Sequence, residues 1–373
     1  MMRGLALVAG IAGCGDNLEV PFGFDKHVLD PVFRSEGVTV FDVDQDGHLD
    51  IVTGEQWHIG PAFTHARDLR DPQMWDPTMA YARGFLVFHQ DVDADGYLDL
   101  VVSHGPGNKL EWCRNPLGQD EHWACHPVLG TMAGESPQYV DLFGTGPTLL
   151  AGVEPGRTLG LLTPGVLDQP WTVQPLSTPD FLPVAQHGLG TVDINGDGKL
   201  DVVTGAGWLE QPAIAASGPW PWHPVEICLN NCAHITGFDI TGDGLVDLLG
   251  ASPHGYGAWW WEQVAGGQFV RHDIDDTVSQ NHAAQLADLD RDGVPELVTG
   301  KRWLAHLSGD PGTDDPVLLV IYKLDRATMT WTRLQIDDDS GVGNQFEVVD
   351  VDRDGKLDIV TSTKKGLFWF EQR

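Results

Sequence analysis

An acidic motif that recurs along the chain constrains the fold more than any other feature of the sequence. Six full copies, of the kind DVDQDGHLD, start at Asp42, Asp91, Asp193, Asp239, Asp288 and Asp350. A seventh copy, DLFGTGPTLLA, starts at Asp141 and keeps the spacing after losing most of its acids. Successive starts are 49, 50, 52, 46, 49 and 62 residues apart. A period of this length is typical of one four-stranded blade of a β-propeller.

Each repeat divides into four short β-strands, called A to D in chain order. Strand A is the apolar run before the first aspartate, and strand B is the run after the motif, such as LDIVTG. Strand C is aromatic, as in GAWWWEQV, and strand D alternates between polar and apolar residues, as in QFVRHDID. The runs are rich in β-branched and aromatic residues and are separated by Gly, Pro and Asp, which is typical of strands joined by turns.

The two ends of the chain complement each other. The last repeat stops after its strand C at Arg373, and residues 23–30, GFDKHVLD, resemble a strand D without a repeat of its own. Pairing these residues with the C-terminal GLFWFEQ would complete the seventh blade and remove the exposed edges of an open ring. The sequence therefore predicts an all-β fold, a seven-bladed β-propeller of four-stranded antiparallel blades that forms one domain over residues 22–373.

Charge and composition exclude some partners. The chain has 54 acidic and 22 basic residues, and its formal net charge of −32 leaves it unable to neutralise a nucleic-acid backbone. Beyond the N-terminus, no stretch approaches the roughly 18 apolar residues of a membrane span. We therefore expect a monomer with no nucleic-acid partner, which contacts a membrane only through an N-terminal anchor.

The first fourteen residues, MMRGLALVAGIAGC, resemble a bacterial lipoprotein signal. One arginine precedes a short apolar run, and Ile11-Ala12-Gly13-Cys14 resembles a lipobox, which would make a lipidated Cys14 the first residue of the mature chain. Residues 15–21 would then form a linker. An ordinary secretory signal and a buried N-terminal strand are the alternatives. The prediction is an exported protein anchored at the bacterial cell envelope, or a secreted or periplasmic one if the lipobox is not used.

The remaining four cysteines form two local pairs along the chain. An even number of cysteines in an exported protein favours disulfides, here Cys113–Cys125 and Cys228–Cys232. Free thiols are the alternative. The stretch CLNNC has no second ligand pair at the spacing of a zinc site, so a zinc site is excluded there.

The spacing of oxygens within the motif suits calcium. Positions 1, 3, 5 and 9 offer side-chain oxygens and position 7 a backbone carbonyl, a ligand number that favours calcium over magnesium or a transition metal. The glycine at position 6, such as Gly47, allows the tight turn. An EF-hand would need a glutamate at position 12 and flanking helices, whereas a β-type run follows here. Solvated acidic turns without a metal are the alternative.

The loops resemble those of FG-GAP and VCBS repeats, which also occur in the propeller of the integrin α-subunit. The resemblance implies Ca²⁺ at five to six sites in the A–B turns. Thr241 weakens the site of the fifth repeat, and the third repeat, with Phe143, Thr145 and Thr148 at ligand positions, is expected to bind no ion. Carried over by position, the implied ligands are Asp42, Asp44, Asp46 and Asp50; Asp91, Asp93, Asp95 and Asp99; Asp193, Asn195, Asp197 and Asp201; Asp239, Thr241, Asp243 and Asp247; Asp288, Asp290, Asp292 and Glu296; and Asp350, Asp352, Asp354 and Asp358.

A ligand or catalytic site is expected on the face opposite the calcium loops. The B–C turns and the starts of the A strands share that face, and ring folds bind ligands where variable loops surround the central channel. Histidines there can act as acids or bases, and Lys or Arg can bind a carboxylate or stabilise an enolate. Taken singly, a histidine is more typical of blade packing. Glu135 and His306 lie in the same segments, and the candidate residues are His187, His234, His254, His282, Lys301 and Arg302.

Two functional hypotheses follow. The first is a calcium-binding, envelope-anchored propeller that binds a glycan or protein ligand on the face opposite the loops. The second comes from residues 254–263, 280–303 and 336–352, which resemble bacterial VCBS propellers related to the propeller part of aldos-2-ulose dehydratase. That resemblance, and the architecture shared with propeller polysaccharide lyases, implies a carbon–oxygen lyase that acts by β-elimination on a keto-sugar or a uronate-containing glycan.

Overall fold

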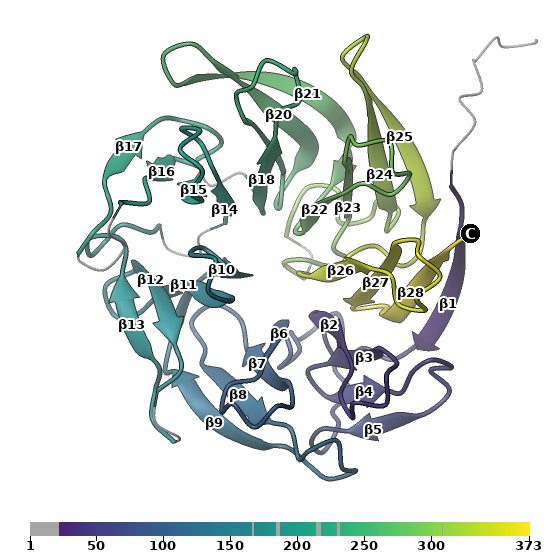
Figure 1. The fold of residues 1–373 in the computed structure, drawn as a ribbon. Coiled ribbons are helices and arrows are strands. Elements are labelled where there is room, and N and C mark those ends of the chain that lie inside the picture. The colour runs from purple at the N-terminus through teal and green to yellow at the C-terminus, as the bar shows by residue number, and fades with distance from the viewer. Residues whose placement is uncertain (1–21, 166–167, 184–186, 214–217, 230–231, 308) are drawn as a thin grey trace, which may run out of the picture.

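Seven four-stranded antiparallel sheets form a closed ring in the computed structural model of the chain (Figure 1). The structure describes residues 22–373 except 166–167, 184–186, 214–217, 230–231 and 308. The predicted leader, the lipobox cysteine Cys14 and the linker 15–21 lie outside the described residues. Within the described part of the chain, no helix is long and apolar enough to cross a membrane. The predicted all-β, seven-bladed fold is confirmed.

The first strand of each blade lies nearest the channel and the fourth lies on the rim (Figure 1). Blades one and two comprise β2 (Val38–Phe41), β3 (Asp50–Thr53), β4 (Gln56–His58) and β5 (Ala66–Asp68), then β6 (Leu86–Gln90), β7 (Asp99–Ser103), β8 (Leu110–Arg114) and β9 (Ala124–Leu129). Blades three and four comprise β10 (Met132–Val140), β11 (Thr148–Val153), β12 (Thr158–Thr163) and β13 (Thr172–Pro175), then β14 (Leu189–Val192), β15 (Asp201–Thr204), β16 (Gly207–Leu209) and β17 (Trp222–Pro224). Blades five and six comprise β18 (Ile235–Phe238), β19 (Asp247–Ala251), β20 (Tyr256–Val264) and β21 (Gln268–Ser279), then β22 (Ala284–Ala287), β23 (Glu296–Gly300), β24 (Leu319–Asp325) and β25 (Thr330–Asp337).

Blade seven joins the two ends of the chain. Its first three strands are β26 (Phe346–Val349), β27 (Asp358–Thr363) and β28 (Gly366–Gln372), and its rim strand is β1 (Phe24–Asp30). The pairing is antiparallel, with Phe24 opposite Gln372 and Asp30 opposite Leu367. In Figure 1 the purple β1 therefore lies beside the yellow β28. This closure leaves no blade without its outer strand, as the sequence predicts.

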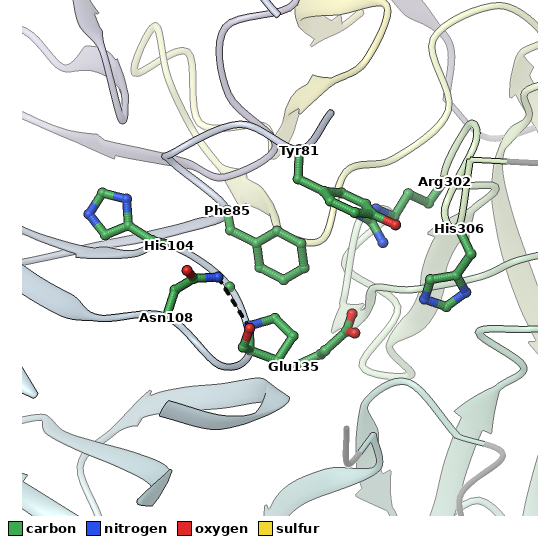
Figure 2. Close-up of a pocket in the computed structure, with 9 residues that line it drawn as sticks. Tyr81, Phe85, His104, Asn108, Glu135, Arg302 and His306 are labelled. Carbon is green, nitrogen blue, oxygen red and sulfur yellow. Dashed lines mark hydrogen bonds between the residues drawn. The ribbon is translucent and has the colours of Figure 1, made fainter. Parts of the chain in front are cut away.

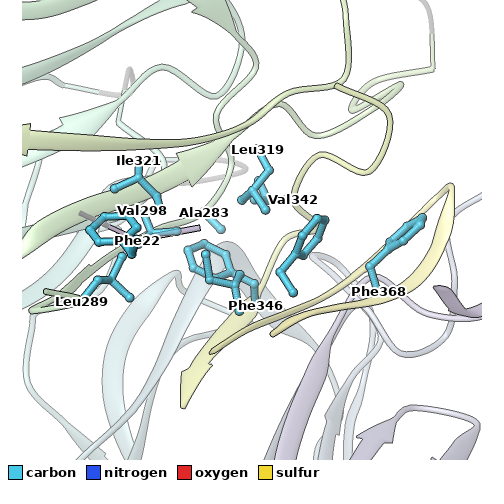
Figure 3. Packing of buried hydrophobic residues seen from close by; sticks show 11 residues of the cluster. Phe22, Ala283, Leu289, Val298, Leu319, Ile321, Val342, Phe346 and Phe368 are labelled. Atoms are coloured by element: carbon cyan, nitrogen blue, oxygen red, sulfur yellow. The ribbon is translucent and has the colours of Figure 1, made fainter. Parts of the chain in front are cut away.

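The hydrophobic core is divided into seven clusters, and each cluster lies between two neighbouring blades. The cluster between blades six and seven, drawn in Figure 3, packs Leu319 and Ile321 against Phe346 and Phe368. Phe22, just before the closing strand, joins the same cluster. Full burial of each such side chain contributes about 1.5–3 kcal/mol. Because every blade is apolar on both faces, the ring is stabilised only when all blades have a neighbour on each side.

The last acid of each full motif organises its A–B loop from inside. Asp50 is 1% exposed, and its Oδ2 accepts a hydrogen bond from Val43 N (2.9 Å) while Oδ1 accepts one from Gly60 N (2.8 Å). The first bond closes the loop and the second ties it to the end of strand C. The same pair of contacts recurs at Asp99 with Val92 and Asn115, Asp201 with Ile194 and Gln211, Asp247 with Ile240 and Gln263, and Asp358 with Val351 and Gln372.

Two positions of the loop take left-handed backbone conformations. Gly47, at position 6, has φ 94°, as the sequence pattern predicts, and its counterparts in the other full motifs lie between 84° and 92°. Position 4 is also left-handed, with φ 61° at Gln45 and 60° at Arg291. Non-glycine residues rarely adopt this conformation, so the loop holds some backbone strain at position 4.

Blade three stabilises its loop by packing. Phe143 occupies an acid position, and its ring lies edge-on to Trp220 at a centroid distance of 6.5 Å. Asp141 keeps one loop contact, in which its Oδ1 accepts a hydrogen bond from Thr145 N at 3.0 Å. An aromatic contact thus takes the place of the acidic side chain found at this position in four of the other six loops.

Both expected cysteine pairs are bonded in the structure. Cys113–Cys125 joins β8 to the rim strand β9, and Cys228–Cys232 lies in the connection between blades four and five. Each bond is local, with 12 and 4 residues of sequence separation.

Candidate functional site

Three histidines from three blades meet at the channel, on the face opposite the acidic loops. His187 and His282 directly precede the inner strands β14 and β22, and His254 lies in the turn between β19 and β20. The ring centroids are 4.6 Å apart for His187 and His254, and 5.5 Å apart for each of the other two pairs. The topology explains the meeting, because inner-strand starts and B–C turns of neighbouring blades share one end of the channel.

A fourth histidine and an aspartate extend this cluster. The ring of His306 lies 4.4 Å from that of His254 and 5.8 Å from that of His282. Asp310 Oδ2 contacts Nδ1 of His306 at 2.7 Å and Nδ1 of His254 at 3.3 Å. We call His187, His254, His282, His306 and Asp310 the histidine cluster.

The buried histidines of the cluster are held in the neutral form. Burial lowers the pKa of His187 far below its usual range, and the neighbouring His254 lowers it further. Burial also lowers the pKa of His282 well below normal, and Arg302 adds to the effect. The pKa of His254 is also lowered, first by burial and then by the neighbouring His306. Neutral imidazole is the form that binds metals and accepts protons.

The cluster has the donor set of a transition-metal site. One ring nitrogen each from His187, His254 and His282 lies within 4.8 Å of the others. His282 Nδ1 donates to Gln280 O at 3.2 Å, and its buried Nε2 has no hydrogen-bond partner in the described part of the chain. A backbone carbonyl on one nitrogen and a bare second nitrogen is the usual arrangement of a metal-binding histidine. Three histidines with an open fourth position are typical of catalytic zinc.

Arg302 brings a buried positive charge beside the cluster. Its side chain is 2% exposed, and its Nε donates to Glu36 Oε1 at 2.7 Å. Nη1 and Nη2 are buried, and neither has a hydrogen-bond partner among the residues that the structure describes. The guanidinium also lies 5.5 Å from the ring centre of Tyr81 and 5.1 Å from that of Phe85. Unpaired donors of this kind are rare in a protein interior and indicate a site for a water molecule or an anion.

Arg302, Tyr81 and Phe85 border a cavity of about 150 Å³ (Figure 2). Figure 2 shows Tyr81, Phe85, Glu135 and Arg302 around a common space, with His306 beside Arg302. Glu135 Oε2 is buried and lies 3.9 Å from His187 Nε2, which connects the cavity to the histidine cluster. The lining residues are Tyr81, Phe85, His104, Gly105, Pro106, Asn108, Glu135, Arg302 and His306.

Two predicted residues lie at the margin of the site. The ammonium of Lys301 donates to the backbone carbonyls of Gly312, Thr313 and Asp315, and so anchors the long B–C loop of blade six. His234 is partly buried, and burial lowers the pKa of its ring to about 4. The structure thus brings together four of the six candidates: His187, His254, His282 and Arg302.

Sequence reasoning missed Tyr81, Phe85 and Asp310. Tyr81 and Phe85 end the long insertion that follows blade one, and Tyr81 Oη donates to Ala305 O (3.0 Å) in the insertion of blade six. The ammonium of Lys364 lies 4.5 Å from the Tyr81 ring and donates to Leu304 O at 2.9 Å. The two insertions therefore contact each other. Both connections are long, between β5 and β6 and between β23 and β24, but no periodic pattern in the sequence assigns their side chains.

The acidic loops have features that fit calcium. Carboxylate oxygens of Asp42, Asp44 and Asp50 lie within 4.8 Å of one another. Buried carboxylate oxygens at Asp44 and Asp350 have no hydrogen-bond partner within the described ranges. A buried carboxylate without a partner carries a large desolvation cost, which a bound cation would offset. The same spacing recurs in six loops of the sequence, and in blades two and six a basic side chain, Arg114 or Lys323, contacts the loop carboxylates.

Family comparisons agree with the fold. Residues 239–299 match the model of the FG-GAP-like repeat, and residues 186–210 match that of the FG-GAP repeat. The fold and the loops define a seven-bladed repeat propeller of the ligand-binding type. With the two matches, the chain is identified as an FG-GAP-like seven-bladed β-propeller.

Similarity to individual proteins is low. No curated protein matches the chain, so the narrower resemblance to the dehydratase propeller stays a prediction. An Agrocybe aegerita lectin that recognises non-reducing terminal N-acetylglucosamine is 14% identical, with a TM-score of 0.47 and coverage of 91% of this chain and 86% of the lectin. The Vibrio cholerae biofilm matrix protein Bap1 is 14% identical, with a TM-score of 0.37 and coverage of 87% of this chain and 47% of Bap1.

Proposed function

We propose that the channel cavity binds a carbohydrate that carries a carboxylate. The observation that carries this proposal is Arg302, a buried guanidinium beside the cavity with two unpartnered nitrogens. A guanidinium fork matches a carboxylate with two parallel hydrogen bonds. Tyr81 and Phe85 supply aromatic surface for a sugar ring, and Asn108 and Glu135 supply polar groups for hydroxyls. A cavity of about 150 Å³ suits one sugar unit better than a protein surface.

Binding measurements with matched variants test this proposal. Isothermal titration calorimetry with uronic-acid oligosaccharides is expected to show one saturable site in the full chain. Arg302→Lys keeps the charge opposite Glu36 and removes the planar fork, so affinity is expected to fall at least about tenfold. Arg333→Gln, on the rim strand β25, is the matched control and is expected to bind normally. Equal affinity for the wild type and Arg302→Lys would exclude Arg302 as the carboxylate site.

A second candidate function is β-elimination on the same ligand. The observation that favours it is the meeting of three neutral histidines next to Arg302. His306 borders the cavity, and Asp310 occupies its Nδ1, so Nε2 is the atom available to take the proton from the carbon next to the carboxylate or ketone. The bond from the β-carbon to the leaving oxygen then breaks, a carbon–carbon double bond forms, and the leaving oxygen takes a proton.

The positive groups around the cavity would stabilise the enolate of this reaction. Arg302 would hold the substrate carboxylate as charge develops on it. A divalent transition metal held by His187, His254 and His282 would supply further positive charge at that point. The Asp310 carboxylate would hold the His306 ring in place through Nδ1.

Product formation distinguishes the enzyme from the binding module. Uronate and keto-sugar substrates are incubated with the metal-loaded chain, and a conjugated double bond is followed by ultraviolet absorbance. His306→Gln is expected to abolish the product, whereas His223→Gln, a rim histidine paired with Glu210, is expected to leave it unchanged. Ligand binding without product across the panel would leave the binding function alone standing.

We also propose that calcium stabilises the A–B loops and that a lipid on Cys14 anchors the chain to the cell envelope. The unpartnered loop oxygens support the first part, and the sequence Ile11-Ala12-Gly13-Cys14 supports the second. Chelation is expected to lower the melting temperature, and an unchanged melting temperature would exclude structural calcium. Mass spectrometry of the native membrane fraction is expected to find a diacylglyceryl group on Cys14, and an unmodified N-terminus would exclude the anchor.

A further inference from the structure

Two of the six full acidic loops receive a basic side chain from strand C of their own blade. Both basic residues lie at the same position of strand C. In each blade, the first residue after the motif pairs with a residue of strand C, and the basic residue is the next one along that strand. In blade six Leu297 pairs with Tyr322, and Lys323 follows. In blade two Leu100 pairs with Cys113, and Arg114 follows. The strand register therefore directs both cations to their own A–B loops.

Lys323 contacts three of the four ligand positions of its loop. Its ammonium lies 2.8 Å from Asp292 Oδ2 and 3.2 Å from Glu296 Oε1, and it also forms an ion pair with Asp290. The Glu296 side chain is 1% exposed and that of Asp290 is 11% exposed, so these two contacts are shielded from solvent, whereas Asp292 is 44% exposed. Asp288 is not among the partners of Lys323, and its Oδ1 stays buried and unpaired. The ammonium thus lies where the carboxylates of positions 3, 5 and 9 converge.

Arg114 makes a smaller set of contacts in blade two. Its Nε lies 2.6 Å from Asp93 Oδ2, and its Nη2 lies 3.0 Å from Asp95 Oδ2. The Arg114 side chain is 45% exposed, compared with 28% for Lys323. Two contacts from a more exposed side chain hold the loop less firmly than three contacts from a more buried one.

Three other blades carry an acid at the same register position. The residue is Glu210 in blade four, Glu262 in blade five and Glu371 in blade seven. Each glutamate contacts a histidine of the neighbouring rim strand, at 2.7, 2.9 and 2.8 Å. These blades add negative charge next to the loop, and blade one has the neutral Ile59. A basic residue at this position therefore separates the loops of blades two and six from the other four full loops.

We propose that Lys323 takes the place of calcium in the loop of blade six, and that Arg114 does so less completely in blade two. Calcium then fills the loops of blades one, four, five and seven first. A divalent cation in the loop of blade six would have to displace the Lys323 ammonium, which already neutralises the loop carboxylates at short range. This inference rests on the proposed calcium binding of the other loops, and it reduces the five to six expected sites to four.

Calcium stoichiometry in charge variants tests the proposal. The apo chain, prepared by chelation, is titrated with Ca²⁺ by calorimetry at a calcium concentration that saturates the strongest sites. The wild type is expected to bind four ions and Lys323→Gln five. Lys323→Arg, which keeps a cation, is expected to bind four. Lys356→Gln is the matched control, because Lys356 also contacts a loop acid, Asp354, but lies at position 7 on the loop surface; it is expected to bind four.

A second measurement keeps the test independent of folding losses. Without calcium, Lys323→Gln is expected to melt below the wild type, and calcium is expected to raise its melting temperature by more than that of the wild type. Calcium density in the loop of blade six in a wild-type crystal, or no additional ion in Lys323→Gln, would overturn the proposal. A wild type that binds no calcium would refute the calcium function of the other loops, while a gain of one ion in Lys323→Gln would still support the role of Lys323.

Discussion

The ion pair between Arg302 and Glu36 gives a sharp prediction, because it joins the proposed ligand site to the stability of the ring. Both side chains are almost fully buried, with 2% and 0% exposure, and the Nε–Oε1 distance is 2.7 Å. At an effective dielectric constant of about 20, two charges at this distance attract each other by about 6 kcal/mol. Arg302→Met leaves the buried Glu36 carboxyl group without its partner, and removal of one member of a buried pair costs about 3–5 kcal/mol.

Urea unfolding followed by tryptophan fluorescence measures this loss as a lower free energy of unfolding. The double variant Glu36→Met/Arg302→Met removes both charges, so it is expected to recover most of the stability that the single variant loses. Arg302→Lys is expected to lose less than Arg302→Met, since it keeps a cation for Glu36. A loss below about 1 kcal/mol in Arg302→Met would refute the buried ion pair, and with it the argument that the free guanidinium nitrogens await a ligand.

Three further predictions follow from the loops and the channel strands. Asp201→Ala leaves two buried backbone N–H groups unpaired and is expected to lower the free energy of unfolding by about 2–4 kcal/mol, measured in urea; a loss under 0.5 kcal/mol would contradict the role of position 9. Phe143→Ala removes the contact with Trp220 and is expected to cost about 1–3 kcal/mol to the same extent with and without chelator; a cost that depends on calcium would indicate an ion in blade three. Burial raises the pKa of Glu347 from 4.5 to about 7, so the folded state holds this proton more tightly than the unfolded chain, and stability is expected to fall by about 3 kcal/mol as the pH rises from 4.5 to 7. Glu347→Gln is expected to remove this part of the pH dependence, and an unchanged pH profile would contradict it.

The fold could be predicted because every repeat has the same local sequence pattern. A motif that demands a tight turn, flanked by apolar runs of strand length, leaves few options for a unit of about 50 residues. The partial last repeat and the orphan strand β1 then specify how the ring closes. Phe143 shows the limit of this logic, because its loop lost the acids and kept its shape through a contact with Trp220, which is 77 residues away in the sequence.

The site could be predicted only in part. Strand direction placed His187, His254 and His282 at one end of the channel, because topology alone decides that. It could not separate them from Lys301, whose side chain turns into its own loop and binds backbone carbonyls. Tyr81 was missed because it lies in an insertion without a periodic pattern. The contact of Lys323 with its loop depends on the exact strand register, which the sequence pattern predicts to within a residue or two at best.

The central claim is that the channel cavity recognises a carboxylate through Arg302. The most direct measurement compares the affinity of the full chain for a uronic-acid oligosaccharide and for the same oligosaccharide with its carboxyl groups reduced to alcohols. Both sugars offer the same rings to Tyr81 and Phe85, so the difference isolates the carboxylate. The account predicts binding at least about tenfold tighter for the acidic sugar, a difference of about 1.4 kcal/mol or more that disappears in Arg302→Lys. Equal affinity for the two sugars would contradict it.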